Sequence, residues 1–176
     1  IVVKKNDMEK FTLILAKNKF VKTIFKQLEN EYSSQFVRYE KKGELPVSFD
    51  MLIDGLGVRQ TNAVFGYDML RSHSEKKKIK GIEKEVTLLV PRRELLVAMK
   101  LHSGRATDLR DVAALCKVLD LALIQKVIRK GDTTPVKESI AKLISLLDDT
   151  DFINSFKGIF LEKKYDLDVQ EIKKLQ

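Results

Sequence analysis

The spacing of apolar positions divides the chain into a first part of mixed period and a second part in which helical spacing prevails. In the first part, apolar residues recur at intervals of three and four over residues 8–17 and 19–31, which predicts two helices. Apolar and polar residues alternate over 36–40 and 46–54, which predicts a β-hairpin that closes into a glycine turn. Helical spacing returns over 61–72, so a further helix is expected there.

The second part begins at Pro91, because proline is tolerated in the first turn of a helix. Ahead of it, residues 85–90 have the composition of a strand, and residues 76–80 form a turn or a short strand. After it, two helical segments flank a break at Gly104, and helical spacing continues to the end of the chain.

These patterns predict an α+β fold, a mixed sheet with helices over 1–90, followed by an all-helical part over 91–176. Of the 176 residues, 44% are hydrophobic and 33% are charged, and no run of about 18 apolar residues occurs, so no membrane span is expected. The single cysteine, Cys116, lies on the apolar side of a predicted helix. We expect a buried thiol in a protein of the reducing cytoplasm.

The net charge of +8 bears on the choice of partner. Such an excess attracts phosphate-rich molecules through its field and through counterion release. The basic residues are spread along the chain, apart from a run within 75–80 and two lysine pairs near the C-terminus. A solvated surface therefore explains the charge as well as a nucleic-acid partner does, and both interpretations stay open.

Asp50 is the unusual residue of the predicted hairpin. Aspartate is disfavoured inside a strand, and here it follows Phe49 and precedes Met51 in an alternating segment. Its carboxylate either lies on a solvated face of the strand or is directed at a ligand. The strand alone does not decide between the two.

A second group of charges gathers beside the glycine break between the two predicted helices. Lys100 and Arg105 flank the break, and Asp108 and Asp111 are three residues apart, so a helix places both carboxylates on one face. These four residues either form a binding site or a salt-bridge cluster between helices. His102 is interpreted as a residue at a helix end, not as a catalytic base.

The segments "PVSFDMLID" and "VPRRELLVAMKLHSGRATDLRDVAAL" resemble the minimal nucleotidyltransferases of the AbiEii type, in which some members act in toxin–antitoxin pairs. The resemblance spans about 1–119, and the helices beyond it match only in being helical. It implies a catalytic core similar to that of DNA polymerase β. In that family a Gly-Ser pair and an Asp-x-Asp on a strand hold the nucleotide triphosphate through Mg²⁺, and a third carboxylate on a neighbouring strand completes the site.

The resemblance assigns roles to five residues of this chain. Asp50 matches the third carboxylate, which makes it a metal ligand and a catalytic residue. Lys100 and Arg105 match positions that bind the nucleotide, through charge-assisted hydrogen bonds to phosphate. Asp108 and Asp111 match the acidic pair of the following helix, which fixes a neighbouring arginine or assists the chemistry.

One departure from the family pattern concerns the metal site. No Gly-Ser and no Asp-x-Asp precede Asp50, and in the family that strand would lead directly into Ile1-Val2-Val3. We therefore expect an N-terminal portion ahead of Ile1; the alternative is a domain that has lost its metal site. As printed, the chain is not expected to catalyse, since Asp50 alone cannot hold two magnesium ions.

The resulting expectation is a Mg²⁺-dependent nucleotidyltransferase that moves a nucleoside monophosphate from a nucleoside triphosphate to an acceptor. The acceptor is an RNA such as a transfer RNA, a protein or a small hydroxylated molecule. The alternative is a non-catalytic module of the same fold that binds nucleic acid or a partner protein. A homodimer and a protein partner also stay open.

Overall fold

The structure is a computed structural model that describes residues 1–27, 35–161 and 166–176. Its contacts group the chain into two compact units, one of residues 1–58 and 64–72 and the other of residues 59–63 and 73–176. The protein is a mixed α+β protein with a mixed sheet, as the sequence predicted. The hairpin just ahead of Pro91, which the sequence placed with the α/β part, groups with the helices.

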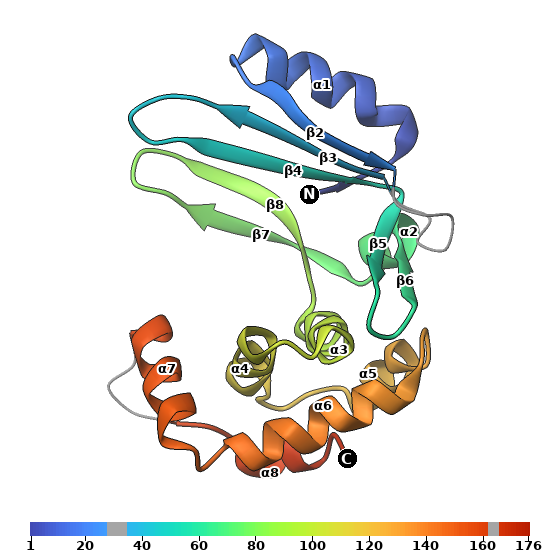
Figure 1. Ribbon diagram of the computed structural model, residues 1–176, viewed down its shortest axis with the longest axis vertical. Coiled ribbons are helices and arrows are strands. Elements are labelled where there is room, and N and C mark those ends of the chain that lie inside the picture. The colour runs from blue at the N-terminus through green and yellow to red at the C-terminus, as the bar shows by residue number, and fades with distance from the viewer. Residues whose placement is uncertain (28–34, 162–165) are drawn as a thin grey trace. The chain divides into compact units, whose positions relative to one another are not determined.

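The first unit is built on a four-stranded sheet with a helix on one face (Figure 1). Its elements are β1 (Val2–Val3), the 3-10 turn Lys5–Asp7, α1 (Met8–Lys17), β2 (Val21–Gln27), β3 (Gln35–Lys41), β4 (Val47–Ile53), β5 (Gly55–Val58), β6 (Ala63–Gly66) and α2 (Tyr67–Ser72). The strand order is β1-β4-β3-β2, with β1 parallel to β4 and the other neighbours antiparallel.

The core of this unit lies between the sheet and α1. The side chains buried there are Val3, Leu15, Val37, Tyr39, Met51 and Ile53. Residues 37, 39, 51 and 53 alternate along β3 and β4, so one face of the sheet meets the helix and the other does not. Thr12 on α1 shares a hydrogen bond with the Tyr39 hydroxyl at 2.8 Å, which satisfies the polar end of that buried ring.

The second unit consists of a two-stranded hairpin followed by helices. Its elements are β7 (Ser74–Lys80), β8 (Glu85–Pro91), α3 (Arg93–Ser103), α4 (Ala106–Leu115), α5 (Leu121–Ile128), α6 (Thr133–Leu146), α7 (Thr150–Phe160) and α8 (Val169–Lys173). Helix α3 is the centre of the helical packing, since it contacts α4, α5 and α6. Leu95, Leu101 and Leu109 are fully buried in this core.

Aspartates fix the starts of the last four helices. Asp120, Asp132, Asp149 and Asp168 each accept a hydrogen bond from a backbone N–H of the first turn. Such a cap satisfies an amide that has no partner inside the helix, and it places a negative charge at the positive end of the helix dipole. The sequence predicted a helix start at Thr134 and Pro135; the cap lies just ahead, and Pro135 occupies the first turn.

One of the expected helices is wrong, and a second is wrong in its first half. Residues 21–27 form strand β2 of the sheet, where the sequence predicted a helix over 19–31, of which 28–31 lie outside the described residues. Val21, Thr23 and Ile24 are β-branched, and pairing with β3 outweighs a helical spacing that the same residues also fit.

The predicted helix over 61–72 is a strand in its first half. Residues 63–66 form β6, and only 67–72 are helical. The glycine turn expected after the hairpin is also wrong, because 55–58 form β5, the partner of β6. Gly55 is required there by space: a Cβ on it would lie 2.8 Å from the carbonyl oxygen of Phe65.

Candidate functional site

Asp50 lies on the face of the sheet that α1 does not cover. The alternation along β4 buries Met51 and leaves Asp50 partly exposed, as the sequence pattern predicted. Its carboxylate is held by Arg38, directly opposite on β3, with Nε to Oδ1 at 2.6 Å and Nη2 to Oδ2 at 2.8 Å. This two-point hydrogen bond from Arg38 lowers the pKa of Asp50 below its usual value.

Strand β1 continues alongside β4 up to the level of Asp50. Val2 is level with Leu52, and Ile1 extends the ladder, since its nitrogen donates to the carbonyl oxygen of Asp50 at 2.6 Å. In a parallel pair with this register, a residue joined ahead of Ile1 would lie level with Asp50.

The residues predicted beside the glycine break come together in the second unit around Asp108. Oδ1 of Asp108 accepts from Nζ of Lys100 at 3.0 Å, and Oδ2 accepts from Oγ of Ser103 at 2.7 Å and from Nε of Arg105 at 2.6 Å. Lys100 also donates to Oδ2 of Asp111 at 2.7 Å. We call these five residues the Asp108 cluster.

The turn between α3 and α4 builds this cluster. Gly104 ends α3 in the left-handed conformation, with φ of 62°, and donates its N–H to the carbonyl oxygen of Lys100. The chain then reverses within one residue and starts α4 at Ala106. The last turn of α3, which carries Lys100 and Ser103, therefore faces the first turn of α4.

Burial and hydrogen bonding set the charges of the cluster. Burial acts to raise the pKa of Asp108, but the hydrogen bonds from Arg105, Ser103 and Lys100 outweigh it and leave the pKa below its ordinary value. Burial likewise acts to lower the pKa of Lys100, and its bonds to Asp111 and Asp108 turn the shift upward. Both shifts favour the charged forms of Asp108 and Lys100.

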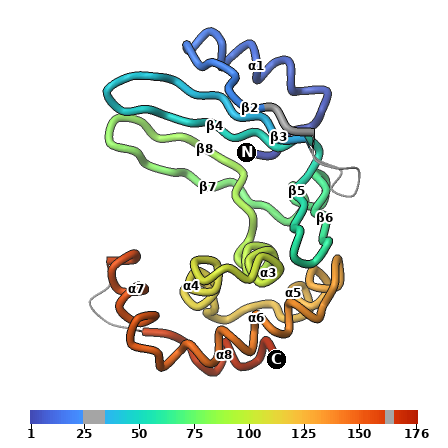
Figure 2. Tube along the Cα trace, viewed as in Figure 1, coloured from blue at the N-terminus to red at the C-terminus, as the bar shows by residue number. Residues whose placement is uncertain are grey.

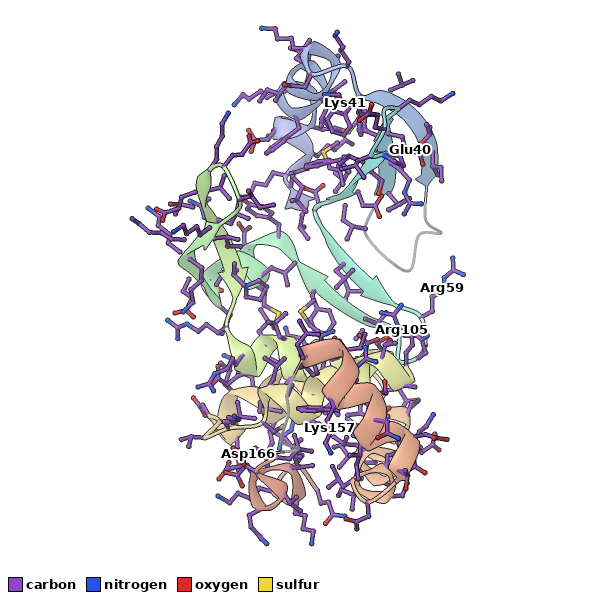
Figure 3. The ribbon with its side chains drawn as sticks, turned by 90° about the vertical axis from the view of Figure 1, so that its left-hand side faces the viewer. Glu40, Lys41, Arg59, Arg105, Lys157 and Asp166 are labelled. Atoms are coloured by element: carbon purple, nitrogen blue, oxygen red, sulfur yellow. The ribbon has the colours of Figure 1, made fainter. Side chains whose placement is uncertain are left out.

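The cluster holds its cations in place and leaves one of them accessible. The side chain of Asp108 is 7% exposed, whereas that of Arg105 is 69% exposed and lies at the surface (Figure 3). A guanidinium anchored through Nε can offer its outer N–H groups to a phosphate or carboxylate. Asp108, with three donors on its two oxygens, is suited to positioning Lys100 and Arg105; a catalytic role for Asp108 and Asp111 stays a prediction.

Arg110, one turn along α4, is directed away from this cluster. Its Nη1 donates to Oγ of Ser155 on α7 at 2.8 Å. Its Nε is buried without a hydrogen-bond partner in the described structure. The Asp108 carboxylate therefore fixes Arg105, and Arg110 serves the packing of α4 against α7.

The residues described here do not by themselves fit a magnesium site. Both oxygens of Asp50 accept from Arg38, and Asp50 and the Asp108 cluster belong to different units. Within residues 1–27, 35–161 and 166–176, no three His, Cys, Asp or Glu side chains gather closely enough to hold a metal ion. Two Mg²⁺ ions need several carboxylate oxygens at close quarters, so further ligands would have to come from beyond these residues.

Sequence reasoning missed Arg38, although a signal was present. Arg38 and Asp50 are equally distant from Glu44, the middle of the turn between β3 and β4, and an antiparallel hairpin pairs residues in that way. Ser103 was read only as part of the helix break. Its hydrogen bond to Asp108 forms because the chain reverses at Gly104. The sequence indicated a break at Gly104, but it did not show that the break brings Ser103 next to Asp108.

His102 lies in the last turn of α3, as its interpretation as a helix-end residue expected, and it is also part of the core. Its side chain is buried, with Nδ1 2.8 Å from Oγ1 of Thr61 and Nε2 3.4 Å from the carbonyl oxygen of Val127. Burial lowers its pKa below the ordinary value. Cys116 is buried as predicted, and burial raises its pKa to about 12, so its thiol stays protonated.

Comparison with known proteins adds no relative to this picture. No family model matches the chain, and a search of curated proteins finds no significant match. Across the helices that the structure describes, none combines the length and the apolar character needed to span a bilayer.

Proposed function

We propose that this chain is the core of a Mg²⁺-dependent nucleotidyltransferase, which transfers a nucleoside monophosphate from a nucleoside triphosphate to an acceptor. One observation carries the proposal: Asp50 lies on the open face of β4, beside the start of the parallel strand β1. A carboxylate in this place could serve as one ligand of a metal ion. The resemblance of the sequence to the AbiEii-type nucleotidyltransferases adds to this observation.

The Asp108 cluster supports the same proposal through its preset cations. Lys100 and Arg105 are held by hydrogen bonds of 3.0 Å and 2.6 Å to Asp108, so little side-chain entropy is lost when they bind phosphate. Arg105 would bind a phosphate through its exposed guanidinium, and Lys100 would add a fixed positive charge. None of these residues identifies the acceptor. They are consistent with an RNA such as a transfer RNA, with a protein and with a small hydroxylated molecule.

A second candidate is a non-catalytic module that binds nucleic acid or a partner protein. The pair between Arg38 and Asp50 favours it, because an arginine that occupies both carboxylate oxygens competes with a metal ion. If Asp50 only pairs with Arg38 and binds no metal ion, the open face of the sheet is a binding surface and not an active site.

A transfer assay separates the two candidates. The protein as its gene encodes it is incubated with Mg²⁺, labelled nucleoside triphosphates and total RNA or protein. Asp50→Asn should abolish transfer and shift the melting temperature little, since an ion pair exposed to this extent contributes less than about 1 kcal/mol.

Glu44→Gln is the matched control, because Glu44 is an exposed carboxylate in the turn between β3 and β4. It should transfer as the wild type does. Full transfer by Asp50→Asn would exclude Asp50 from the site, and loss of folding in that variant would make Asp50 structural.

A further inference from the structure

The hairpin of β7 and β8 is a solvent-exposed ribbon that leads directly into α3 (Figure 2). Along β7 every residue after Ser74 is exposed, and along β8 every residue before Val90. Antiparallel pairing places cross-strand partners on one face, so the register sorts the side chains into two sets. One face carries Ser74, Lys76, Lys78, Lys80, Glu85, Thr87 and Leu89, and the other carries Glu75, Lys77, Ile79, Val86, Leu88 and Val90.

The first of these faces is basic, and its lysines form a row. Lys76, Lys78 and Lys80 follow one another at alternate positions of β7, about 6.8 Å apart, which is two residues' rise of an antiparallel strand. Between Ser74 and Arg92 the chain has six basic residues against three glutamates. The pair of Lys78 with Glu85 at 3.1 Å lies at the surface and holds neither side chain firmly.

We infer that this row of lysines is a docking surface for the phosphate backbone of a nucleic acid. A regular row of point charges along a β-strand complements a regular row of phosphates, and lysine binds phosphate as a point charge. The surface stands independently of the proposed transfer reaction, since it includes neither Asp50 nor the Asp108 cluster.

The arrangement of the two faces favours a nucleic acid over an anionic membrane. A membrane would take up exposed apolar side chains, and three of those on the two strands, Ile79, Val86 and Leu88, lie on the opposite face, against Leu89 alone on the face of the lysine row. The lysine row would then point away from the lipid headgroups. A polyanion that contacts only the basic face has no such conflict.

Backbone contacts of this kind have a recognisable signature. They carry no base information, so affinity is similar for different sequences. Each lysine on a phosphate releases a counterion, so the logarithm of the binding constant falls with the logarithm of the salt concentration. Loss of three contacts should reduce that slope by about 2 to 3.

The test measures binding of the purified protein to a fluorescein-labelled single-stranded RNA of mixed sequence, and to its duplex, by anisotropy. Salt is varied between about 50 and 200 mM, without Mg²⁺ or nucleotide. The variant Lys76→Gln/Lys78→Gln/Lys80→Gln should lose affinity at least about tenfold at the lowest salt and show the reduced slope. A triple Lys→Arg variant at the same positions should retain both affinity and slope, and circular dichroism confirms that each variant is folded.

The matched control is Lys126→Gln/Lys137→Gln/Lys142→Gln, which removes the same charge from exposed helix positions. It should bind RNA nearly as the wild type does. An equal loss in both triple variants would mean that binding follows net charge alone, and wild-type affinity in the hairpin variant would exclude the lysine row. Absence of RNA binding, with or without binding to phosphatidylserine vesicles, would also overturn the inference. A failed transfer assay would leave it untouched.

Discussion

Asp108 shows how a single carboxylate organises the charges around it. Three donors share its two oxygens, and its side chain is almost fully buried. A buried carboxylate without such partners would take up a proton instead of staying charged. Asp108 is therefore best understood as the anchor that keeps Lys100 and Arg105 in place for a ligand.

Because His102 is buried in the second unit, its protonation makes the free energy of unfolding depend on pH. Its pKa is lowered in the folded state by burial, so the unfolded chain takes up a proton first as the pH falls below the ordinary histidine value. The stabilisation is present in full above about pH 6.5 and is lost progressively below it, until the folded pKa is reached. The free energy of unfolding, measured by urea titration from pH 8 to pH 5, should fall over this window.

His102→Gln should flatten this dependence, because the amide can serve Thr61 and Val127 without titrating. His73→Gln, which removes the other and less buried histidine, is the matched control for the substitution itself. An unchanged pH profile in His102→Gln would show that other groups cause the loss of stability.

At the scale of elements, Gly131 contacts the segment 59–63 so closely that a side chain at position 131 would not fit. A Cβ on Gly131 would lie 2.4 Å from the carbonyl oxygen of Thr61 and 2.8 Å from the Cβ of Ala63. That carbonyl oxygen also accepts the N–H of Asp132 at 2.7 Å, so the backbone has little freedom to retreat. The sequence indicated Gly131 as a helix end. In the structure, the missing side chain also lets the backbone at Gly131 approach the backbone of residues 61–63.

Gly131→Ala should destabilise the protein by about 1–3 kcal/mol, the usual cost of forcing atoms into a packed contact. Thermal unfolding should show a fall of several degrees in melting temperature. Gly158→Ala in α7 is the control, because nothing lies within 4 Å of its added Cβ and alanine favours a helix. A stable Gly131→Ala variant would contradict the described approach of residues 59–63.

Local patterns predicted most elements correctly, and pairing explains the exceptions. The helix over 8–17, the strands around Asp50 and the break at Gly104 followed from spacing and from glycine chemistry. Strand β2 did not, because a β-branched segment can satisfy helical spacing until a neighbouring strand pairs with it. Whether such a segment forms a strand depends on the strand that pairs with it, and the spacing of apolar residues within the segment carries no information on that partner.

At the scale of the whole molecule, the candidate residues divide between the two units. Asp50 and Arg38 belong to the first, and the Asp108 cluster belongs to the second. The sequence identified both groups through residue type and spacing. It did not identify Arg38 or Ser103 as partners, because hydrogen bonds across a hairpin or a helix turn depend on register.

The central claim is that this fold binds a nucleoside triphosphate with Mg²⁺, and calorimetric titration tests it most directly. Each triphosphate is titrated with Mg²⁺ into the protein as its gene encodes it and into the Lys100→Ala variant of that protein. We predict saturable, Mg²⁺-dependent binding to the encoded protein. Lys100→Ala should weaken this binding at least about tenfold, because it removes a charge-assisted contact to the nucleotide. No binding of any triphosphate by the encoded protein would contradict the account.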